Sequence, residues 1–516
     1  MFCEKKSGDP VTEAVHLAFG IPYLYPWQRL VIANILDAVS AWRAIQRGET
    51  ADGDELFDED GVHRGRQIVL LPTGAGKSLC FQAPALLLDG PTLVIYPLLA
   101  LMNDQWKRLE AGGIEPVLLR GGQSAEERNA QLARMEGSDG KPPARLIIAN
   151  PEVLKSDALR ERIQKRGIEH LAIDEAHCVA EWGDSFRPAY LELGELIREL
   201  NPPAVTAFTA TASPPVLARV AEILFGGEAH LVRGETDRAN IRFEVNHCFI
   251  KETALMREVS RRKRPMIVFC ATRGGTERTA IALSNAFPGI DCRFYHAALD
   301  REEKKAVEDW FPSADDCILA ATCAWGMGMD APHVRTVIHR DPPPSAEAYL
   351  QEAGRAGRDG ESAEAILLWS PEDGRRIALK KEGAERRRGM VMADLAEGGK
   401  CRRETLLAAL GDARAGPDAP GGEHIACSGC DICDGTARSG AGDLETVRRF
   451  VATNPRRYRT AEAVTFLLER ANGVSIAAIG FPVWRRSDFA ALIEYLRRTG
   501  SVRVLEKWPW KGYLAP

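Results

Sequence analysis

The chain has 516 residues, which exceeds one ordinary hydrophobic core and predicts three or four domains. Hydrophobic residues make up 45% of it and charged residues 27%, which is typical of a globular protein and not of one embedded in a membrane. Its net charge of −5, from 67 Lys and Arg against 72 Asp and Glu, excludes a uniformly basic coat for nucleic acid and leaves only local basic faces.

The start of the chain and its cysteines bear on its location. The first ten residues, MFCEKKSGDP, lack the apolar segment of a secretory signal, and no run of about 18 apolar residues is free of charges or of Pro and Gly. Eight of the twelve cysteines are scattered singly, as expected for reduced, buried thiols. We therefore expect a cytoplasmic protein with no membrane partner.

Short apolar runs alternate with helical stretches between about residues 66 and 370. The runs occupy residues 67–71, 92–96, 145–149, 170–174, 204–208, 266–270, 317–322 and 365–369. Continuously apolar strands that alternate with helices indicate parallel sheets covered on both faces. Eight such runs exceed one sheet, so we predict two α/β domains that meet near residues 234–245, where the alternation pauses.

Changes in composition predict the remaining boundaries. Residues 49–61 contain seven acids and no base, which predicts a solvated loop inserted into the first domain, because like charges do not pack together. After residue 371 the chain becomes polar and basic, and its last 76 residues are expected to form a small separate domain. The predicted domains are residues 1–233, 234–370, 371–440 and 441–516.

Residues 70–78, LLPTGAGKS, lie between the first predicted strand and a helical run. Glycines in such a turn let backbone N–H groups face an anion, Lys77 reaches the terminal phosphates, and the Ser78 hydroxyl suits Mg²⁺. The usual phosphate-loop pattern has glycine where Leu71 stands, but the strand–turn–helix context favours a nucleotide site over a chance loop. The nucleotide-binding residues expected from this loop are Thr73, Gly74, Gly76, Lys77 and Ser78.

The sequence IDEAH at residues 173–177 ends another apolar run. We expect Asp174 to hold Mg²⁺ and Glu175 to orient or deprotonate the attacking water. Acids at the carboxyl end of a strand lie where doubly wound sheets bind their ligands. Alone, this motif also fits the start of a surface helix, but together with the phosphate loop it predicts a nucleoside triphosphatase.

Residues 351–360, QEAGRAGRDG, place Arg355 and Arg358 three positions apart among glycines. An Arg of one domain that stabilises charge on the γ-phosphate bound to another would link hydrolysis to domain closure. The alternative is a solvated basic helix end. We predict that both arginines are catalytic.

Together these motifs resemble the RecQ family of ATP-dependent DNA helicases, within superfamily two, from about residue 19 to 434. The most specific segments are LPTGAGKSLCFQAPAL (71–86), YPLLALMNDQ (96–105), DEAHCVAEWGDSFRPAYLEL (174–193), FTATAS (208–213), ATCAWGMGMDAPHVRTVIH (321–339) and YLQEAGRAGRDG (349–360). The resemblance implies an α/β fold of two RecA-like parallel-sheet domains in tandem, with single-stranded DNA lying across both. A zinc-binding helical module and a small α+β winged-helix-like domain would follow.

The resemblance also implies nucleotide contacts outside the phosphate loop, from Gln28, Asp330 and Gln351. Gln28 would read the adenine edge through its amide. An aromatic residue and an Arg that are usual in the family near this position are replaced by Ile21 and Tyr25, so stacking on the base would fall to Tyr25 or Tyr23.

In the family, an aromatic-rich loop after the DEAH motif couples DNA contact to ATP hydrolysis. This chain offers Trp182, Phe186, Arg187 and Tyr190 there. Flat rings stack on any base and Arg meets phosphate, so we expect the first three to bind DNA. The alternative is that Trp182 and Phe186 pack in the core. The family's His in this loop is replaced by Asp184, which predicts altered coupling.

Four cysteines, Cys401, Cys427, Cys430 and Cys433, form a C-x₂₅-C-x₂-C-x₂-C pattern. Such a set closes a tetrahedral Zn²⁺ site. Disulfides are disfavoured in a reducing compartment, and an iron–sulfur cluster is the remaining alternative. The resemblance to the family's zinc module favours zinc in a purely structural role.

Residues 441–516 contain 13 Lys and Arg against 7 Asp and Glu. Their pattern predicts helix, helix and hairpin, as in a winged helix, with Arg485 and Arg486 facing DNA phosphates and a hairpin bearing Trp508 and Trp510 that wedges a duplex. The alternative is a small interaction domain with an ordinary basic face.

The favoured function is an ATP-dependent DNA helicase that moves 3′→5′ on single-stranded DNA and unwinds forked or tailed duplexes in repair, recombination or defence. Its cofactors would be ATP, Mg²⁺ and Zn²⁺. One alternative is a DNA-stimulated ATPase that translocates or remodels protein–DNA complexes without unwinding. A DNA-binding scaffold is disfavoured, because a full set of catalytic residues is present.

Overall fold

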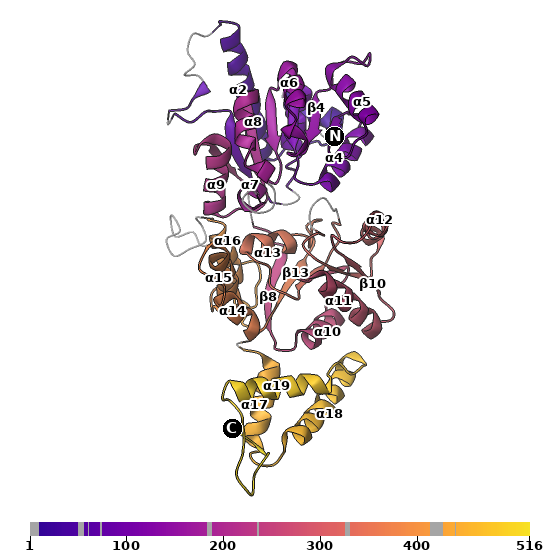
Figure 1. Ribbon diagram of the computed structural model, residues 1–516, viewed down its shortest axis with the longest axis vertical. Coiled ribbons are helices and arrows are strands. Elements are labelled where there is room, and N and C mark those ends of the chain that lie inside the picture. Colours follow the sequence, from indigo (N-terminus) through magenta and orange to yellow (C-terminus); the bar gives the residue numbers. More distant parts are fainter. Residues whose placement is uncertain are drawn as a thin grey trace, which may run out of the picture. The chain divides into compact units, whose positions relative to one another are not determined.

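The computed structural model describes residues 10–49, 56–59, 61–72, 75–182, 188–234, 237–325, 331–412, 427–438 and 440–516. The chain divides into two compact units, Met1–Asp237 and Arg238–Pro516 (Figure 1). Of the acidic loop predicted at 49–61, residues 50–55 and 60 lie outside the described residues. No helix in the described ranges has the length and apolarity that crossing a membrane requires.

The first unit is built on a seven-stranded sheet whose paired strands are all parallel. In spatial order the strands are β3 (Val117–Leu119), β4 (Leu146–Ala149), β2 (Thr92–Ile95), β5 (His170–Ile173), β6 (Ala204–Thr209), β1 (Arg66–Leu70) and β7 (His230–Arg233). Every residue of the central strands β2, β4, β5 and β6 is buried, as their continuous apolar runs predict.

Helices cover this sheet and precede or follow its strands. They are α1 (Pro10–Phe19), α2 (Pro26–Gln46), α3 (Leu79–Leu87), α4 (Leu99–Ala111), α5 (Ala125–Glu136), α6 (Asp157–Arg166), α7 (His177–Trp182), α8 (Leu193–Leu200) and α9 (Pro214–Phe225). Two short 3₁₀ turns occupy Val153–Lys155 and Pro188–Tyr190. The core is continuous: Leu93 and Leu171 of the sheet pack in one cluster with Ile163 of α6 and Val220 of α9, and none of the four is more than 1% exposed.

The second unit begins with a six-stranded parallel sheet. Its order is β10 (Asp291–Tyr295), β11 (Cys317–Ala321), β9 (Met266–Phe269), β12 (Thr336–His339), β13 (Ala363–Trp369) and β8 (Ile241–His247). The helices α10 (Lys251–Arg261), α11 (Arg273–Ala286), α12 (Arg301–Trp310) and α13 (Ala346–Ala353) connect these strands. The prediction of two parallel-sheet α/β domains is therefore confirmed.

One strand differs from the sequence expectation. β8 starts at Ile241, inside the segment where the alternation was expected to pause. As an edge strand it buries only alternate side chains at its start, so charged residues interrupt its apolar pattern and hide it from a search for continuous runs.

A helical module follows β13 and packs beside the edge strand β8 (Figure 1). It comprises α14 (Pro371–Ala378), α15 (Ala384–Glu397), α16 (Arg402–Ala409) and the segment 427–438. Its core joins Met392 and Leu406 to Phe243 of β8 and Trp369 of β13.

The last part of the chain contains α17 (Gly442–Thr453), α18 (Thr460–Ile479) and α19 (Arg486–Arg498), followed by the antiparallel pair β14 (Arg503–Val504) and β15 (Leu514–Ala515). The two predicted helices and the hairpin are present, and α17 adds a third helix. A separate core of Val447, Leu467, Leu492 and Leu514 holds these elements together.

Candidate nucleotide, arginine and cysteine sites

Three chain segments with polar side chains leave the sheet of the first unit at the same edge. β1 leads to the loop with Lys77, β5 leads to Asp174 and Glu175, and β6 ends at Thr209. β5, β6 and β1 are neighbours in one parallel sheet, so their carboxyl ends lie side by side. This is the edge where doubly wound sheets bind ligands.

Gln28 fixes the described part of the phosphate loop. Its Nε2 donates hydrogen bonds to the carbonyl oxygens of Ala75 (3.2 Å) and Gly76 (3.4 Å), and its Oε1 accepts one from the Tyr25 backbone N–H (2.9 Å). Gly76 has φ of +74°, and a Cβ there would lie 2.4 Å from Gln28 Nε2, so glycine is required. Gln28 is buried with its amide already engaged, and the expected adenine contact stays a prediction.

Three charged groups meet behind this loop. Lys77 Nζ lies 3.6 Å from Glu175 Oε1, and both side chains are largely buried. Asp174 Oδ1 accepts a hydrogen bond from the Glu175 backbone N–H at 2.9 Å. Burial, together with the Glu175 charge, raises the pKa of Asp174 to about 6. The hydroxyl of Ser78 and the carboxylate of Asp174 are the hard oxygen donors that Mg²⁺ prefers, so the residues fit a metal–phosphate ligand.

The backbone of Glu175 is strained, with φ of +49° for a residue that is not glycine. Such conformations carry a strain of about 1–3 kcal/mol and concentrate at functional sites. The strain is accommodated because the backbone is held on both sides: Asp174 N–H donates to the Ile95 carbonyl and Ala176 N–H to the Phe208 carbonyl.

His177 and Thr209 form a contact to which sequence reasoning assigned no role. His177 Nδ1 lies 3.4 Å from Glu175 Oε2 and 3.0 Å from Thr209 Oγ1, which in turn donates to the Thr211 carbonyl at 3.2 Å. The DEAH segment is thereby tied to the end of β6. The motif FTATAS, which begins at the end of an apolar run, was the sequence signal that could have indicated a role for Thr209.

The aromatic residues near Gln28 are exposed. Tyr23 is 62% exposed and Tyr25 49% exposed. The Tyr25 ring stacks on Trp27 with centroids 4.7 Å apart and an interplanar angle of 7°, so one of its faces is covered. Stacking of either tyrosine on a base stays a prediction.

Several predicted site residues fall outside the described residues: Thr73, Gly74, Phe186, Arg187, Asp330 and the Trp182 side chain. Tyr190, grouped with the aromatic loop by resemblance, is fully buried in the core of the first unit and presents no face for a base. Tyr190 ends the 3₁₀ turn Pro188–Tyr190 and belongs to the same core cluster as Leu193 and Ile197 of α8, so its role is packing.

In the second unit, two side chains from the start of the unit hold the loop that carries Arg355 and Arg358. Arg238 donates to the Gly357 carbonyl at 2.7 Å and to the Ala356 carbonyl at 3.3 Å. Asn240 Nδ2 donates to the same Gly357 carbonyl at 2.8 Å. Sequence reasoning missed both, because they lie in the segment interpreted as a seam.

This loop concentrates positive charge. Arg355 is buried, Arg358 is half-buried, and Gln351 lies in the last turn of α13 just before them. Burial, followed by repulsion from Arg358, lowers the pKa of Arg238. Three guanidinium groups gathered at one loop favour a bound anion, and the phosphate chemistry predicted for this motif fits that charge.

The four clustered cysteines come together as predicted. Their Sγ atoms all lie within 4.8 Å of one another, and those of Cys430 and Cys401 are 3.9 Å apart. Sulfurs around a tetrahedral zinc, with Zn–S of about 2.3 Å, are separated by about 3.8 Å, whereas a disulfide needs about 2.05 Å. The four thiols are unbridged and fit a tetrahedral metal ion.

An ion pair within the module and hydrogen bonds to the backbone of Val245 and Arg238 fasten this cluster to the second sheet and to the start of the second unit. Asp431, between Cys430 and Cys433, pairs with the buried Arg402 at 2.9 Å and accepts a hydrogen bond from the Val245 backbone N–H at 3.2 Å. Arg403, also buried, donates to the Arg238 carbonyl at 3.1 Å. The cysteine cluster and the arginine loop therefore share contacts with the start of the second unit.

The predicted DNA-binding arginines of the last segment have contacts within the chain. Arg485 pairs with Glu252 of α10 at 2.8 Å, and Arg486 donates to Thr465 Oγ1 at 3.1 Å. Both lie at the exposed start of α19. Trp508, at the hairpin, is 90% exposed. Their roles in DNA binding stay predictions.

Comparison with known families identifies both sheet domains. Residues 40–220 match the DEAD/DEAH box helicase model, and residues 250–360 match the helicase conserved C-terminal domain. The ATP-dependent DNA helicase RecQ of Pasteurella multocida is 34% identical over 410 residues, covering 78% of this chain and 62% of that protein. RecQ of Haemophilus influenzae is 33% identical, covering 78% of this chain and 63% of that protein. The chain thus spans about three-fifths of the length of these relatives.

Solved structures share the fold at low sequence identity. The helicase MrfA bound to DNA aligns with a TM-score of 0.54 at 17% identity, covering 98% of this chain and 62% of that one. The DEAD-box helicase Mss116 bound to single-stranded RNA aligns with a TM-score of 0.55 at 16% identity, covering 97% of this chain and 94% of that one. With two helicase models and RecQ relatives matched across most of its length, the chain belongs to the RecQ family of superfamily-two helicases.

Proposed function

We propose that this chain is an ATP-dependent DNA helicase that moves 3′→5′ along single-stranded DNA and unwinds forked or tailed duplexes. One observation carries the proposal: Lys77, Asp174 and Glu175 gather at the carboxyl ends of neighbouring strands, with Lys77 and Glu175 3.6 Å apart. The family relationship supplies DNA as the polymer, since the RecQ relatives are named as DNA helicases.

The residues of the first unit divide the work of hydrolysis. Lys77 exchanges its contact with Glu175 for the phosphates of ATP, which frees Glu175 to orient the attacking water. Ser78 and Asp174 would hold Mg²⁺, which would supply charge neutralisation on the phosphates. Gln28 holds the loop carbonyls of Ala75 and Gly76 through its amide. In this proposal, Thr73, Gly74 and Gly76 donate backbone N–H groups to the phosphates.

Arg355 and Arg358 stabilise the negative charge that develops on the transferred phosphate. Gln351 and Asp330 contribute further nucleotide contacts in this proposal. The loop with Trp182, Phe186 and Arg187 binds single-stranded DNA and reports its presence to Glu175. Arg485 and Arg486 of the last segment contact duplex phosphates.

We further propose four domains: residues 1–233 and 234–370 as the two RecA-like motor domains, 371–440 as a zinc module and 441–516 as a winged-helix-like domain. The spacing of the cysteine sulfurs supports zinc, and the metal would be structural because four thiolates close its coordination. The biological setting proposed is DNA repair, recombination or defence.

A strand-displacement assay tests the helicase proposal. The parent protein should release a labelled strand from a duplex with a 3′ tail or a fork, with ATP and Mg²⁺, and fail on blunt duplex. Lys77→Ala should abolish ATP turnover, whereas Glu175→Gln and Arg358→Ala should keep ATP binding and lose roughly 10³-fold in rate.

The outcomes separate the alternatives. DNA-stimulated ATPase without strand release on any substrate would replace unwinding by translocation or remodelling. DNA binding with no ATP turnover in the parent would leave a scaffold. Near-normal turnover in Arg358→Ala would remove that residue from the catalytic set.

A further inference from the structure

A cavity of about 870 Å³ lies within the second unit. Its walls come from β8, from α10 with the turn that follows it, and from residues 431–446 together with Trp484. The volume is within the range of about 300–1,000 Å³ typical of small-molecule sites. None of the residues proposed for hydrolysis or DNA contact lines it.

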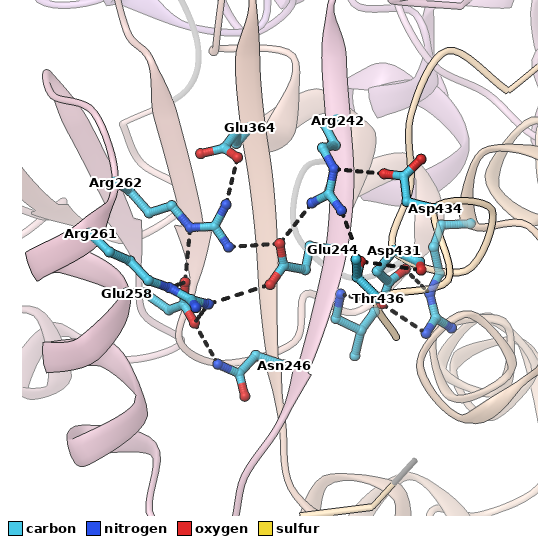
Figure 2. Close-up of polar contacts among 12 residues, drawn as sticks. Arg242, Glu244, Asn246, Glu258, Arg261, Arg262, Glu364, Asp431, Asp434 and Thr436 are labelled. Atoms are coloured by element: carbon cyan, nitrogen blue, oxygen red, sulfur yellow. Dashed lines mark hydrogen bonds and ion pairs between the residues drawn. The ribbon is translucent and has the colours of Figure 1, made fainter. Parts of the chain in front are cut away.

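The glutamates of the wall are fully engaged with arginines (Figure 2). Glu244 accepts from Arg242 at 2.8 Å and from Arg262 at 2.7 Å. Arg262 also bonds Glu258 at 3.0 Å and Glu364 at 2.5 Å, so it bridges three carboxylates across α10, β8 and β13. The charges of these arginines and glutamates therefore neutralise one another within the wall.

The two aspartates of the wall are engaged as well. Asp431, labelled in Figure 2, is neutralised by Arg402 at 2.9 Å. Asp443, at the start of α17, accepts hydrogen bonds from the backbone N–H groups of Phe249 (2.9 Å) and Ile250 (2.8 Å). Each acid of the lining therefore has a partner, although the charges of Asp443 and Glu258 still act on Arg257.

Three cations of the lining remain: Arg257, Lys263 and Arg438. In the described ranges, none of the three forms an ion pair or hydrogen bond with a carboxylate. The Arg257 guanidinium lies 5.1 Å from the centre of the Trp484 ring, which also lines the cavity. The lining holds seven Arg and Lys against five Asp and Glu, so the cavity has a surplus of positive charge.

Two buried donors of the lining are also unused. The Thr253 hydroxyl and the Trp484 indole N–H have no hydrogen-bond partner among the described residues, although their side chains are only 2% and 8% exposed. Buried donors without acceptors are unfavourable, and native proteins satisfy nearly all of them. A ligand with several acceptor oxygens would neutralise the surplus cations, and it would satisfy both donors once their side chains turn toward it.

We propose that this cavity binds a phosphate-bearing ligand, as a second anion site separate from the nucleotide site. Arg257 and Lys263 would neutralise the phosphate, while Thr253 and Trp484 donate hydrogen bonds to its oxygens. Because the lining includes Asp443 and Trp484 of the last segment and α10 of the sheet domain, occupancy would fasten these two parts of the second unit together.

Binding of inorganic pyrophosphate to full-length protein tests this site by titration calorimetry. Lys77→Ala silences the nucleotide site, so the remaining binding should have a stoichiometry of one. Adding Arg257→Gln and Lys263→Gln should weaken it at least tenfold, and adding Arg448→Gln and Arg449→Gln, which remove two exposed arginines of α17 outside the lining, should leave it unchanged. No binding to Lys77→Ala, or equal binding by both sets, would overturn the proposal.

Thr253→Val gives an independent check, because it removes an unsatisfied buried hydroxyl without changing side-chain size. It should raise the melting temperature of the free protein and weaken the binding of pyrophosphate. A lowered melting temperature with unchanged affinity would contradict the site.

A single-stranded oligonucleotide without terminal phosphates then distinguishes the two sources of the phosphate. Competition with pyrophosphate assigns the site to the DNA backbone, and independent binding assigns it to a free phosphorylated ligand. Strand displacement is also measured with the Lys263→Gln protein, so that failure of the phosphate site can be distinguished from failure of the helicase proposal.

Discussion

Arg238 donates a hydrogen bond from Nη2 to the carbonyl oxygen of Gly357 at 2.7 Å. Gly357 has φ of +55° and lies between Arg355 and Arg358, so the contact fixes the one turn that spaces the two arginines. A side chain at Gly357 would place its Cβ 2.6 Å from Asn240 Nδ2, so this close approach requires glycine. The Arg238 carbonyl in turn accepts from Arg403, next to Cys401 and Arg402 in the cysteine module.

The first prediction concerns this support. Arg238→Ala removes donors to the carbonyls of Ala356 and Gly357 and lets the arginine loop relax, so kcat for DNA-stimulated ATP hydrolysis should fall roughly tenfold or more. KM for ATP should change little, because the phosphate loop is in the other unit. Steady-state ATPase measures both. Arg278→Ala, an exposed arginine of α11, is the control, and a kcat equal to its value would make Arg238 structural only.

The second prediction follows from the raised pKa of Asp174, about 6 against an ordinary value of 3.8. Between these two values the folded protein binds more protons than the unfolded one, so stability falls as pH rises through this window. The charged form above pH 6 therefore opposes folding by up to about 3 kcal/mol. Asp174→Asn should raise the melting temperature at pH 7.5 and change it much less at pH 4.5, while ATP turnover is lost at both.

Thermal melts at the two pH values, without nucleotide or metal, check this sign. Asp315→Asn, which neutralises an exposed aspartate, should show no such pH dependence. A stabilising effect that is equal at both pH values would mean that burial does not raise the pKa of Asp174.

The third prediction is that the protein carries one zinc ion per chain. Structural zinc contributes on the order of 10 kcal/mol to the folding of a small module, so Cys430→Ser should lower solubility and DNA binding. The nucleotide site lies in the other unit and should still bind ATP. Elemental analysis with an acid-labile sulfide assay decides the metal. Iron with sulfide would replace zinc, and Cys323→Ser, at an exposed cysteine outside the cluster, is the matched control.

Central strands were predictable because both of their faces are buried. The runs around Leu93, Leu171 and Val205 are continuously apolar, and each is a strand of the first sheet. Edge strands were not, since charged and apolar side chains alternate in them, as in β8 and β10. β3 has only three residues, and β12, although central and buried, has only two apolar residues, Val337 and Ile338, between Thr336 and His339.

Site chemistry was readable where one residue type implies one role. The four cysteines were grouped correctly, because three cysteines at x₂ spacing with a fourth upstream are typical of a four-thiolate metal site. The positioning roles of Gln28, Arg238 and Asn240 were not, since each acts through a backbone carbonyl of a distant loop. Such contacts depend on tertiary structure and leave no local pattern in the sequence.

The last prediction concerns how hydrolysis senses DNA. In the proposed mechanism, Trp182 stacks on a base of single-stranded DNA, and each lost stack removes about 1–3 kcal/mol of affinity or coupling. Trp182→Ala should keep basal ATPase and much of the DNA binding, which phosphate contacts maintain in a salt-sensitive manner, yet lose stimulation by DNA. Asp184→His, which restores the residue usual in the family, should raise the stimulated rate.

ATPase with and without a single-stranded oligonucleotide, at fixed salt, measures both variants. Phe57→Ala removes an exposed ring outside the loop and should behave as the parent does. Stimulation of Trp182→Ala to the parent level would assign Trp182 to packing. Tyr190 already has that role: it follows the same loop but is buried in the first core, so the sensing surface has one ring fewer than the resemblance implied. In the proposed mechanism, coupling then depends on Trp182, Phe186 and Arg187. If alanine substitution of only one of these three residues abolishes stimulation, the sensor reduces to that side chain.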